Sequence, residues 1–133
     1  MRLLKTLLLS LFCIALISFP SCKKEAGEGG QASVTGKVWI ERFNTTGTSS
    51  VGEYAAAYED VYIIYGDDAT YGDRVETNPD GIFEFKYLRP GKCRIYAYSE
   101  GGSISTNRQA VIKDVEISSK KQSVDAGTIE IVK

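Results

Sequence analysis

The side chains with the greatest chemical potential in this chain are three cysteines, Cys13, Cys22 and Cys93, and the chain contains no histidine. Histidine is the commonest general base and the commonest metal ligand in proteins, so its absence removes every Ser-His-Asp or Cys-His arrangement. Residues 101–105 match a nucleophile elbow in part, but their last position is serine instead of glycine and no strand-to-helix context surrounds them. We therefore expect no catalytic residues, no cofactor and no enzyme activity.

The closest approach to a metal site is a group of aspartates, Asp67, Asp68 and Asp73, in a predicted polar turn. Carboxylate oxygens of this kind could hold calcium, but their spacing is not that of an EF-hand loop. Aspartate is also an ordinary turn residue, because its side chain bonds to nearby backbone groups. We expect a turn and no metal centre here, and the sequence leaves calcium binding open.

The N-terminal 21 residues predict an export signal. Arg2 and Lys5 precede an apolar run over residues 7–19, which is shorter than the roughly 20 residues that span a bilayer. Cys22 follows at once, and the polar, glycine-rich residues up to position 32 are typical of a flexible tether. The expected organisation is a signal at 1–21, a tether at 22–32 and one domain at 33–133.

A cysteine directly after an export signal resembles the lipobox of bacterial lipoproteins, and the start Cys22-Lys23-Lys24-Glu25 resembles lipoproteins of the Bacteroides group. The resemblance implies cleavage before Cys22, lipidation of its sulfur, and a place in the bacterial cell envelope, with the outer membrane as the expected location. Phe19 stands where leucine is typical, so an ordinary secretory signal remains an alternative. Cys93 is then left without an intrachain partner, and its apolar position in a predicted strand favours an inert core residue.

Charge argues against one class of partner. The chain has 16 basic and 17 acidic residues, and loss of Arg2 and Lys5 with the signal leaves 14 basic residues and a net charge of −3. Nucleic-acid binding requires a basic patch. We therefore expect no nucleic-acid partner.

The rest of the chain predicts short strands separated by turn residues. Alternating apolar residues and turn signals predict seven strands, at 33–42, 60–65, 73–77, 82–87, 92–98, 108–117 and 126–132. No crossover helix for a parallel α/β fold is visible, although residues 53–59 could form one helical turn or lead into the next strand. The expected fold is all-β, a seven-stranded antiparallel β-sandwich.

One stretch carries a family resemblance. Residues 81–97 hold Gly81, Phe83, Phe85 and Leu88, followed by Pro90-Gly91 and a second alternating run. This pattern resembles the core of carboxypeptidase regulatory-like domains, which belong with the Cna-B-type and transthyretin-like (prealbumin-like) sandwiches. Residues 34–38 and 125–129 resemble the first and last strands of that fold. The resemblance implies Greek-key topology over residues 33–133 and says little about function, because such sandwiches host many roles.

Four aromatic residues are the candidate binding site. By alternation Trp39, Tyr62, Tyr96 and Tyr98 point away from the core, and on a shared sheet they would form an aromatic platform suited to a glycan or a protein. The alternative is β-propensity alone. We expect a non-catalytic envelope lipoprotein that is held at the membrane by its lipid and binds a glycan or a protein partner. A structural spacer or assembly accessory without a ligand is the alternative.

Overall fold

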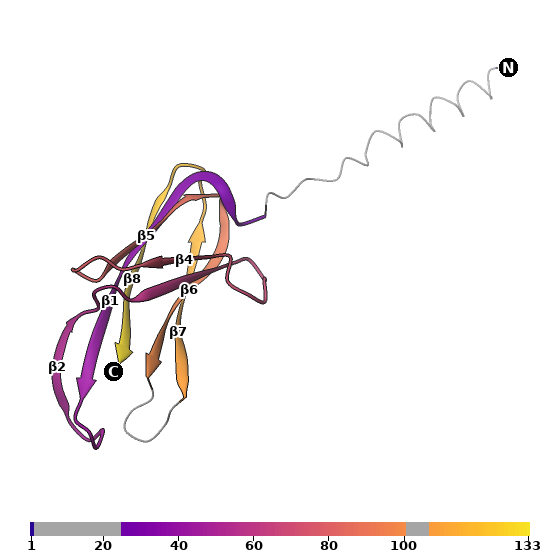
Figure 1. Cartoon of the computed structure of the whole chain (residues 1–133). Coiled ribbons are helices and arrows are strands. Elements are labelled where there is room, and N and C mark those ends of the chain that lie inside the picture. The colour runs from indigo at the N-terminus through magenta and orange to yellow at the C-terminus, as the bar shows by residue number, and fades with distance from the viewer. Residues whose placement is uncertain (2–24, 101–106) are drawn as a thin grey trace.

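The computed structural model describes residues 1, 25–100 and 107–133, and this part of the chain folds into eight β-strands without a helix (Figure 1). The strands are β1 (Glu28–Phe43), β2 (Ser50–Ala55), β3 (Asp60–Tyr65), β4 (Asp73–Glu76), β5 (Ile82–Leu88), β6 (Gly91–Glu100), β7 (Arg108–Ile117) and β8 (Ser123–Val132). Within the described residues, no helix is long and apolar enough to cross a membrane.

The strands form two four-stranded sheets. In the first sheet, β1 is central: β2 and β5 pair antiparallel with its second and first halves, and β8 runs parallel along its other edge. The second sheet has the order β4-β3-β6-β7, with every pair antiparallel. The long strand β1 therefore organises one layer, and the β3–β6 pair forms the middle of the other.

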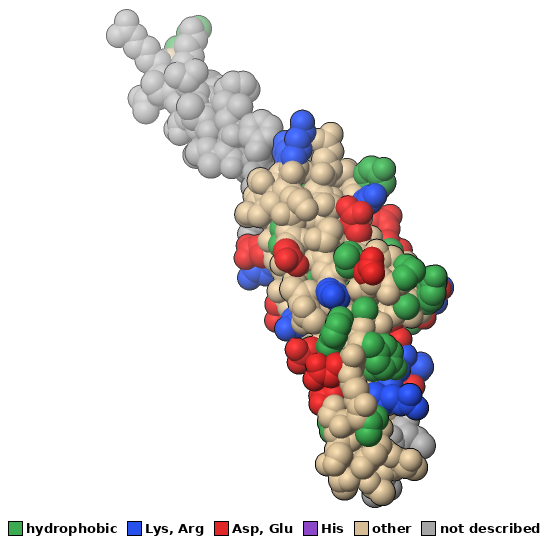
Figure 2. Space-filling model, turned by 90° about the vertical axis from the view of Figure 1, so that its left-hand side faces the viewer, with side chains coloured by type: hydrophobic (Ala, Val, Ile, Leu, Met, Phe, Trp, Pro, Cys, Tyr) green, Lys and Arg blue, Asp and Glu red, His purple; other side chains and the backbone are tan. Residues whose placement is uncertain are grey.

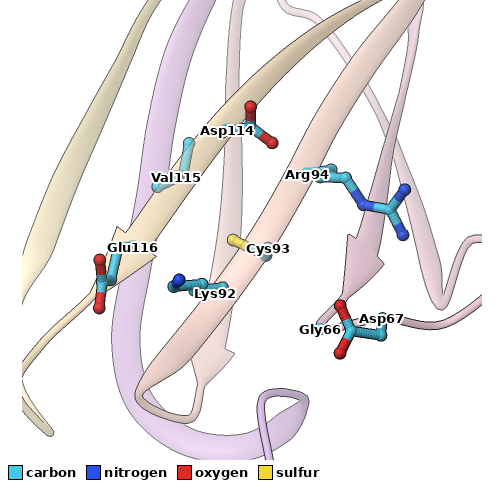
Figure 3. Close-up of a pocket in the computed structure, with 8 residues that line it drawn as sticks. All are labelled: Gly66, Asp67, Lys92, Cys93, Arg94, Asp114, Val115 and Glu116. Atoms are coloured by element: carbon cyan, nitrogen blue, oxygen red, sulfur yellow. The ribbon is translucent and has the colours of Figure 1, made fainter.

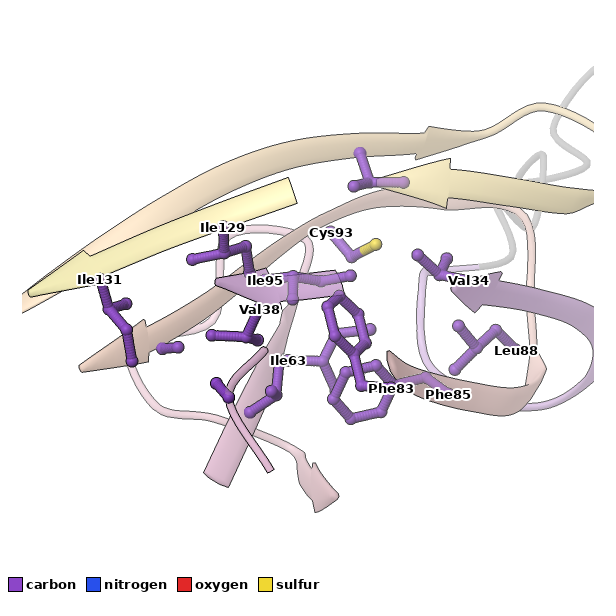
Figure 4. Packing of buried hydrophobic residues seen from close by; sticks show 14 of the residues in the cluster. Val34, Val38, Ile63, Phe83, Phe85, Leu88, Cys93, Ile95, Ile129 and Ile131 are labelled. Carbon is purple, nitrogen blue, oxygen red and sulfur yellow. The ribbon is translucent and has the colours of Figure 1, made fainter. Parts of the chain in front are cut away.

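Alternate residues of both sheets meet in one hydrophobic core (Figure 4). The largest fully buried apolar side chains come from both layers: Val34, Val38, Val61, Ile63, Phe83, Phe85, Leu88, Ile95, Ile129 and Ile131. Full burial of such a side chain contributes about 1.5–3 kcal/mol. A glycine completes the fit, because a Cβ on Gly36 would lie 2.4 Å from Cζ of Phe83.

Thr77 fixes the connection between β2 and β3 to the start of the β4–β5 turn. It is the one buried polar side chain among the described residues, with 2 % of its surface exposed. Its hydroxyl donates to the carbonyl of Ala56 and accepts from the backbone N–H of Glu59 at 2.9 Å. The backbone N–H of Thr77 also donates to the carbonyl of Glu59 at 2.9 Å.

The predicted all-β architecture is confirmed, and three finer expectations differ from the structure. The described residues form eight strands instead of seven, because Ser50–Ala55 forms β2 where we expected a loop followed by a helical turn or a lead-in. The first sheet is mixed, because β8 pairs with β1 in parallel. Strand β1 begins at Glu28, so residues 28–32, which we placed in the tether, belong to the strand, and Ala32 is buried.

A candidate tyrosine-lined binding face

Three of the four aromatic residues singled out in the sequence meet on the outer face of the second sheet. Tyr62 on β3 is the direct cross-strand partner of Tyr96 on β6. Their rings are stacked, with centroids 5.0 Å apart and planes 12° from parallel. Tyr98, two residues further along β6, is edge-on to both, with centroids 5.6 Å from Tyr62 and 5.4 Å from Tyr96. Alternation along β3 and β6 places them there, because every second residue faces outward.

A fourth tyrosine, Tyr71, joins them from the turn between β3 and β4. Its ring meets that of Tyr62 edge-on, with centroids 5.0 Å apart. The next residue, Gly72, donates its N–H to the carbonyl of Ile63 at 2.8 Å. The ring of Tyr65 occupies the space of a side chain there, because a Cβ on Gly72 would lie 2.3 Å from Cε2 of Tyr65. We call Tyr62, Tyr71, Tyr96 and Tyr98 the tyrosine cluster.

The tyrosine cluster is a packed group whose members differ in exposure. Tyr96 lies at its base with 8 % of its surface exposed, whereas Tyr71 is 53 % exposed. Burial, and then the neighbouring Tyr98, raises the pKa of Tyr96 to about 12. Burial and the Asp60 carboxylate raise the pKa of Tyr62. Both phenols are therefore protonated near neutral pH and remain uncharged groups that can donate a hydrogen bond.

Trp39 does not belong to this group, so the four-residue platform that we expected does not form. It lies on β1 in the other sheet, where its Nε1 donates to Oε2 of Glu53 at 3.5 Å. The Nζ atom of Lys37 sits 4.6 Å from the centroid of its ring. Alternation correctly predicted that Trp39 faces away from the core, but it does not say in which sheet a strand lies.

Arginines and an exposed isoleucine surround the tyrosine cluster. Arg74 on β4 is the cross-strand partner of Tyr62, and its Nη1 donates to both carboxylate oxygens of Asp60, at 3.2 and 3.1 Å. The guanidinium of Arg108 lies 5.9 Å from the Tyr98 ring centroid. On the β7 side, Ile112 is the partner of Tyr96 and is 50 % exposed. We call Arg74, Arg108 and Ile112 the rim of the cluster.

A shallow pocket of about 460 Å³ is lined by residues of β6, β7 and the β3–β4 turn (Figure 3). Its Arg94 lies two residues before Tyr96 on β6 and so faces the same side of the sheet. Its charged lining has both signs: Lys92, Arg94, Asp67, Asp114 and Glu116. Cross-strand pairing places Arg94 opposite Asp114 and Lys92 opposite Glu116. The Nη2 of Arg94 donates to the backbone carbonyl of Asp68 at 2.8 Å, which ties this strand to the turn that carries Tyr71. We call this hollow the charged pocket.

Cys93 lies in the wall of the charged pocket and in the hydrophobic core. It is a free cysteine with 4 % of its surface exposed, as its apolar position predicted. Burial raises the pKa of its thiol to about 11. Because the thiolate is the nucleophile, a thiol that stays protonated at neutral pH is chemically inert.

The remaining candidate groups form no second site in the described part of the chain. Over those residues, no group of three or more His, Cys, Asp or Glu side chains could hold a metal ion. Asp67 and Asp68 are exposed, and Asp73 accepts a hydrogen bond from the backbone N–H of Arg74 at 2.7 Å. Cys22 and the serine-rich segment 101–105 lie outside the described residues.

In comparisons with known proteins, the chain matches no protein-family model and no curated protein. The resemblance to carboxypeptidase regulatory-like domains therefore remains a proposal that depends on the residues quoted for it. The function has to be argued from the tyrosine cluster, its rim and the charged pocket.

Proposed function

We propose that this protein is a non-catalytic cell-envelope lipoprotein that binds a protein partner through the tyrosine cluster and its rim. In this proposal Cys22 is lipidated and holds the chain at the outer membrane. The described domain is a member of the prealbumin-like, carboxypeptidase regulatory-like sandwiches with Greek-key topology. The observation that carries the proposal is the packing of Tyr62, Tyr71, Tyr96 and Tyr98 on the outer face of one sheet.

The composition of this face is that of a protein interface. Tyrosine and arginine are enriched among residues that dominate binding energy, because they present large, rigid area at a small cost in conformational entropy. Tyr71 and Ile112 are about half exposed and supply apolar contact area, while Arg74 and Arg108 add charge at the border. A buried base and an exposed upper layer mean that the surface is ordered before a partner arrives.

A glycan is the second candidate ligand, because Arg94 in the lining of the charged pocket lies two residues before Tyr96 on β6. Sugar recognition combines aromatic contact with nearby hydrogen-bonding groups, and the pocket offers cations and carboxylates beside the tyrosine cluster. The interlocked rings favour a protein partner over a glycan, because Tyr62 and Tyr96 stack on each other and do not lie side by side as a flat platform. The third possibility is a spacer without a ligand.

Matched tyrosine variants test the proposal. Native envelope proteins are crosslinked to the mature protein and to two variants, Tyr71→Ala and Tyr87→Ala, and the captured partner is then titrated against each. Tyr87 is 72 % exposed but lies on β5 in the other sheet, so it is a control for the loss of an exposed ring. We expect Tyr71→Ala to weaken binding by roughly thirtyfold or more, the usual hot-spot threshold, and Tyr87→Ala to leave it unchanged.

Equal binding by the two variants would show that the tyrosine cluster is not the interface. A glycan array probed with the same proteins separates the second candidate: Tyr71-dependent glycan binding without a protein partner favours it. Binding to neither favours the spacer. The anchor has its own test, because Cys22→Ala should release the protein from membranes, and unchanged retention would contradict lipidation.

A further inference from the structure

One end of the sandwich carries a basic hollow, close to residues 25–27, which lead into β1. The backbone N–H of Arg89, in the β5–β6 turn, donates to the carbonyl of Gly27 at 2.7 Å. Ala26 packs against the same turn, since a Cβ on Gly91 would lie 2.7 Å from its Cβ. The chain is therefore fixed to the domain from about residue 26 onward, well before the end of the tether that the sequence suggested.

The hollow at this end has a volume of about 630 Å³ and is lined by Gly29, Gly30, Gln31, Arg89, Pro90 and Lys120. Two of these residues are cations and none is an acid. The guanidinium of Arg89 lies over Gly29, where a Cβ would be 3.2 Å from Nη2. Lys120 is exposed in the turn between β7 and β8, with Lys121 beside it. Lys and Arg side chains are visible at this end, which is the upper end of the coloured atoms in Figure 2, and Asp and Glu side chains lie below them.

Chain length places this end near the bilayer if Cys22 is the anchor. Five residue steps separate Cys22 from Gly27, and five steps of extended chain span roughly 18 Å at most. The sequence adds Lys23 and Lys24 within that interval, against Glu25 and, at the start of β1, Glu28. A basic end held this close to an anionic surface is attracted to it over about one Debye length, on the order of 8–10 Å.

We propose that this end of the domain docks on the membrane, with Arg89 and Lys120 binding the phosphates of anionic lipid headgroups. The inference rests on the lipid anchor of the proposed function and is independent of the tyrosine cluster. It assigns an orientation: the β5–β6 and β7–β8 turns face the bilayer, and the β1–β2 turn at residues 44–49 points away from it.

Site-specific quenching tests the orientation. The mature lipidated protein is reconstituted into phosphatidylcholine vesicles, with or without phosphatidylglycerol, that contain a headgroup nitroxide lipid. A fluorophore is attached at Ser119→Cys in the β7–β8 turn or, as a control, at Thr46→Cys in the β1–β2 turn. Buried Cys93 does not compete for the label. We expect strong quenching at position 119 in phosphatidylglycerol vesicles and little at position 46.

Charge variants then test the assigned residues. Each Lys or Arg near an anionic surface strengthens binding by a similar amount, so the loss of two cations has a multiplied effect. We therefore expect the double variant Arg89→Gln and Lys120→Gln to lower the ratio of docked to undocked protein by roughly thirtyfold. The matched control, Arg42→Gln with Lys113→Gln, removes two cations elsewhere and should leave quenching unchanged. Arg89→Lys with native Lys120 should retain docking, which separates loss of charge from local misfolding.

Each other outcome overturns a defined part of the inference. An unquenched label at position 119 in anchored protein would show that the domain stands away from the bilayer. Headgroup binding by these two cations would be refuted if quenching at position 119 were equal with and without phosphatidylglycerol. It would also be refuted if quenching were unchanged in the Arg89→Gln and Lys120→Gln double variant. Mass spectrometry that finds Cys22 without lipid would remove the anchor and the docking together.

Discussion

The buried hydroxyl of Thr77 provides the sharpest test of how this fold is held together. Thr77→Val keeps the shape of the side chain and removes its hydroxyl, so the carbonyl of Ala56 and the N–H of Glu59 both lose a partner. Ala56 is fully buried, whereas Glu59 is half-buried. Thr77→Ser is the matched control, because it keeps the hydroxyl and loses one methyl group.

The expected cost follows from those two orphaned groups. An unsatisfied buried polar group costs about 1–3 kcal/mol, so Thr77→Val should lower the free energy of unfolding by about 2–4 kcal/mol. Loss of one buried methyl group in Thr77→Ser should cost about 1 kcal/mol. Urea denaturation of the mature proteins, followed by Trp39 fluorescence, measures both changes. With a slope of about 2 kcal/mol per molar urea, the Thr77→Val midpoint should fall by on the order of 1–2 M.

The comparison between the two variants decides the result. If Thr77→Val is as stable as the unsubstituted protein while Thr77→Ser is not, the hydroxyl contributes nothing and the volume of the side chain alone matters. A stable Thr77→Val protein would then mean that the β2–β3 connection is held by backbone hydrogen bonds and packing instead of by the Thr77 hydroxyl.

Three further predictions concern packing and titration. Gly36→Ala should lower the free energy of unfolding, measured by thermal denaturation, by about 1–3 kcal/mol, because its Cβ would lie 2.4 Å from Phe83. Gly52→Ala is the control and should be neutral, because its Cβ would have nothing within 4 Å. Equal effects of the two substitutions would contradict the packing of Phe83 against Gly36. The Cys93 thiol, with its pKa raised by burial to about 11, should react with a thiol reagent at pH 8 only after unfolding, and rapid reaction of the folded protein would refute its burial. Because burial raises the pKa of Tyr96 to about 12 from an ordinary 10.0, the folded state holds this proton more tightly, so stability should fall as pH rises from about 10 to 12. Tyr96→Phe should flatten that fall in urea denaturation, and an unchanged slope would count against the assignment.

Most of the correct predictions about the fold came from the alternation of apolar and polar residues along the strands. Along β1 and β6 it correctly separated buried Val34, Val38 and Ile95 from outward Tyr98. It did not predict β2, because nearly every residue of Ser50–Ala55 is exposed and the strand is held by pairing with β1. Backbone hydrogen bonds of this kind leave no hydrophobic pattern in the sequence. The same limit applies to strand direction, since a parallel and an antiparallel β8 would bury the same side chains.

The sequence predicted only part of the tyrosine cluster, because alternation shows which way a side chain faces and does not show which strands lie in the same sheet. Period-two alternation showed that Tyr62 and Tyr96 face outward, and their pairing across β3 and β6 then brought them together. Trp39 satisfied the same rule but belongs to the other sheet, which only topology decides. Tyr71 lies in a turn whose path depends on Gly72 and on the ring of Tyr65, a tertiary contact that no local pattern reveals.

The two proposals together restrict the kind of partner that the tyrosine cluster can meet. β6 starts at Gly91, at the end that we propose to dock on the membrane, and Tyr96 and Tyr98 lie five and seven residues along it, a rise of roughly 17–23 Å. Outward side chains of a strand stand roughly perpendicular to the sheet, so the cluster faces sideways if the strands stand upright on the bilayer. In that orientation the tyrosine cluster would meet proteins that project from the same membrane. Anchoring should then strengthen binding to a partner in the same bilayer through effective concentration, whereas a soluble partner would bind the anchored and released proteins equally.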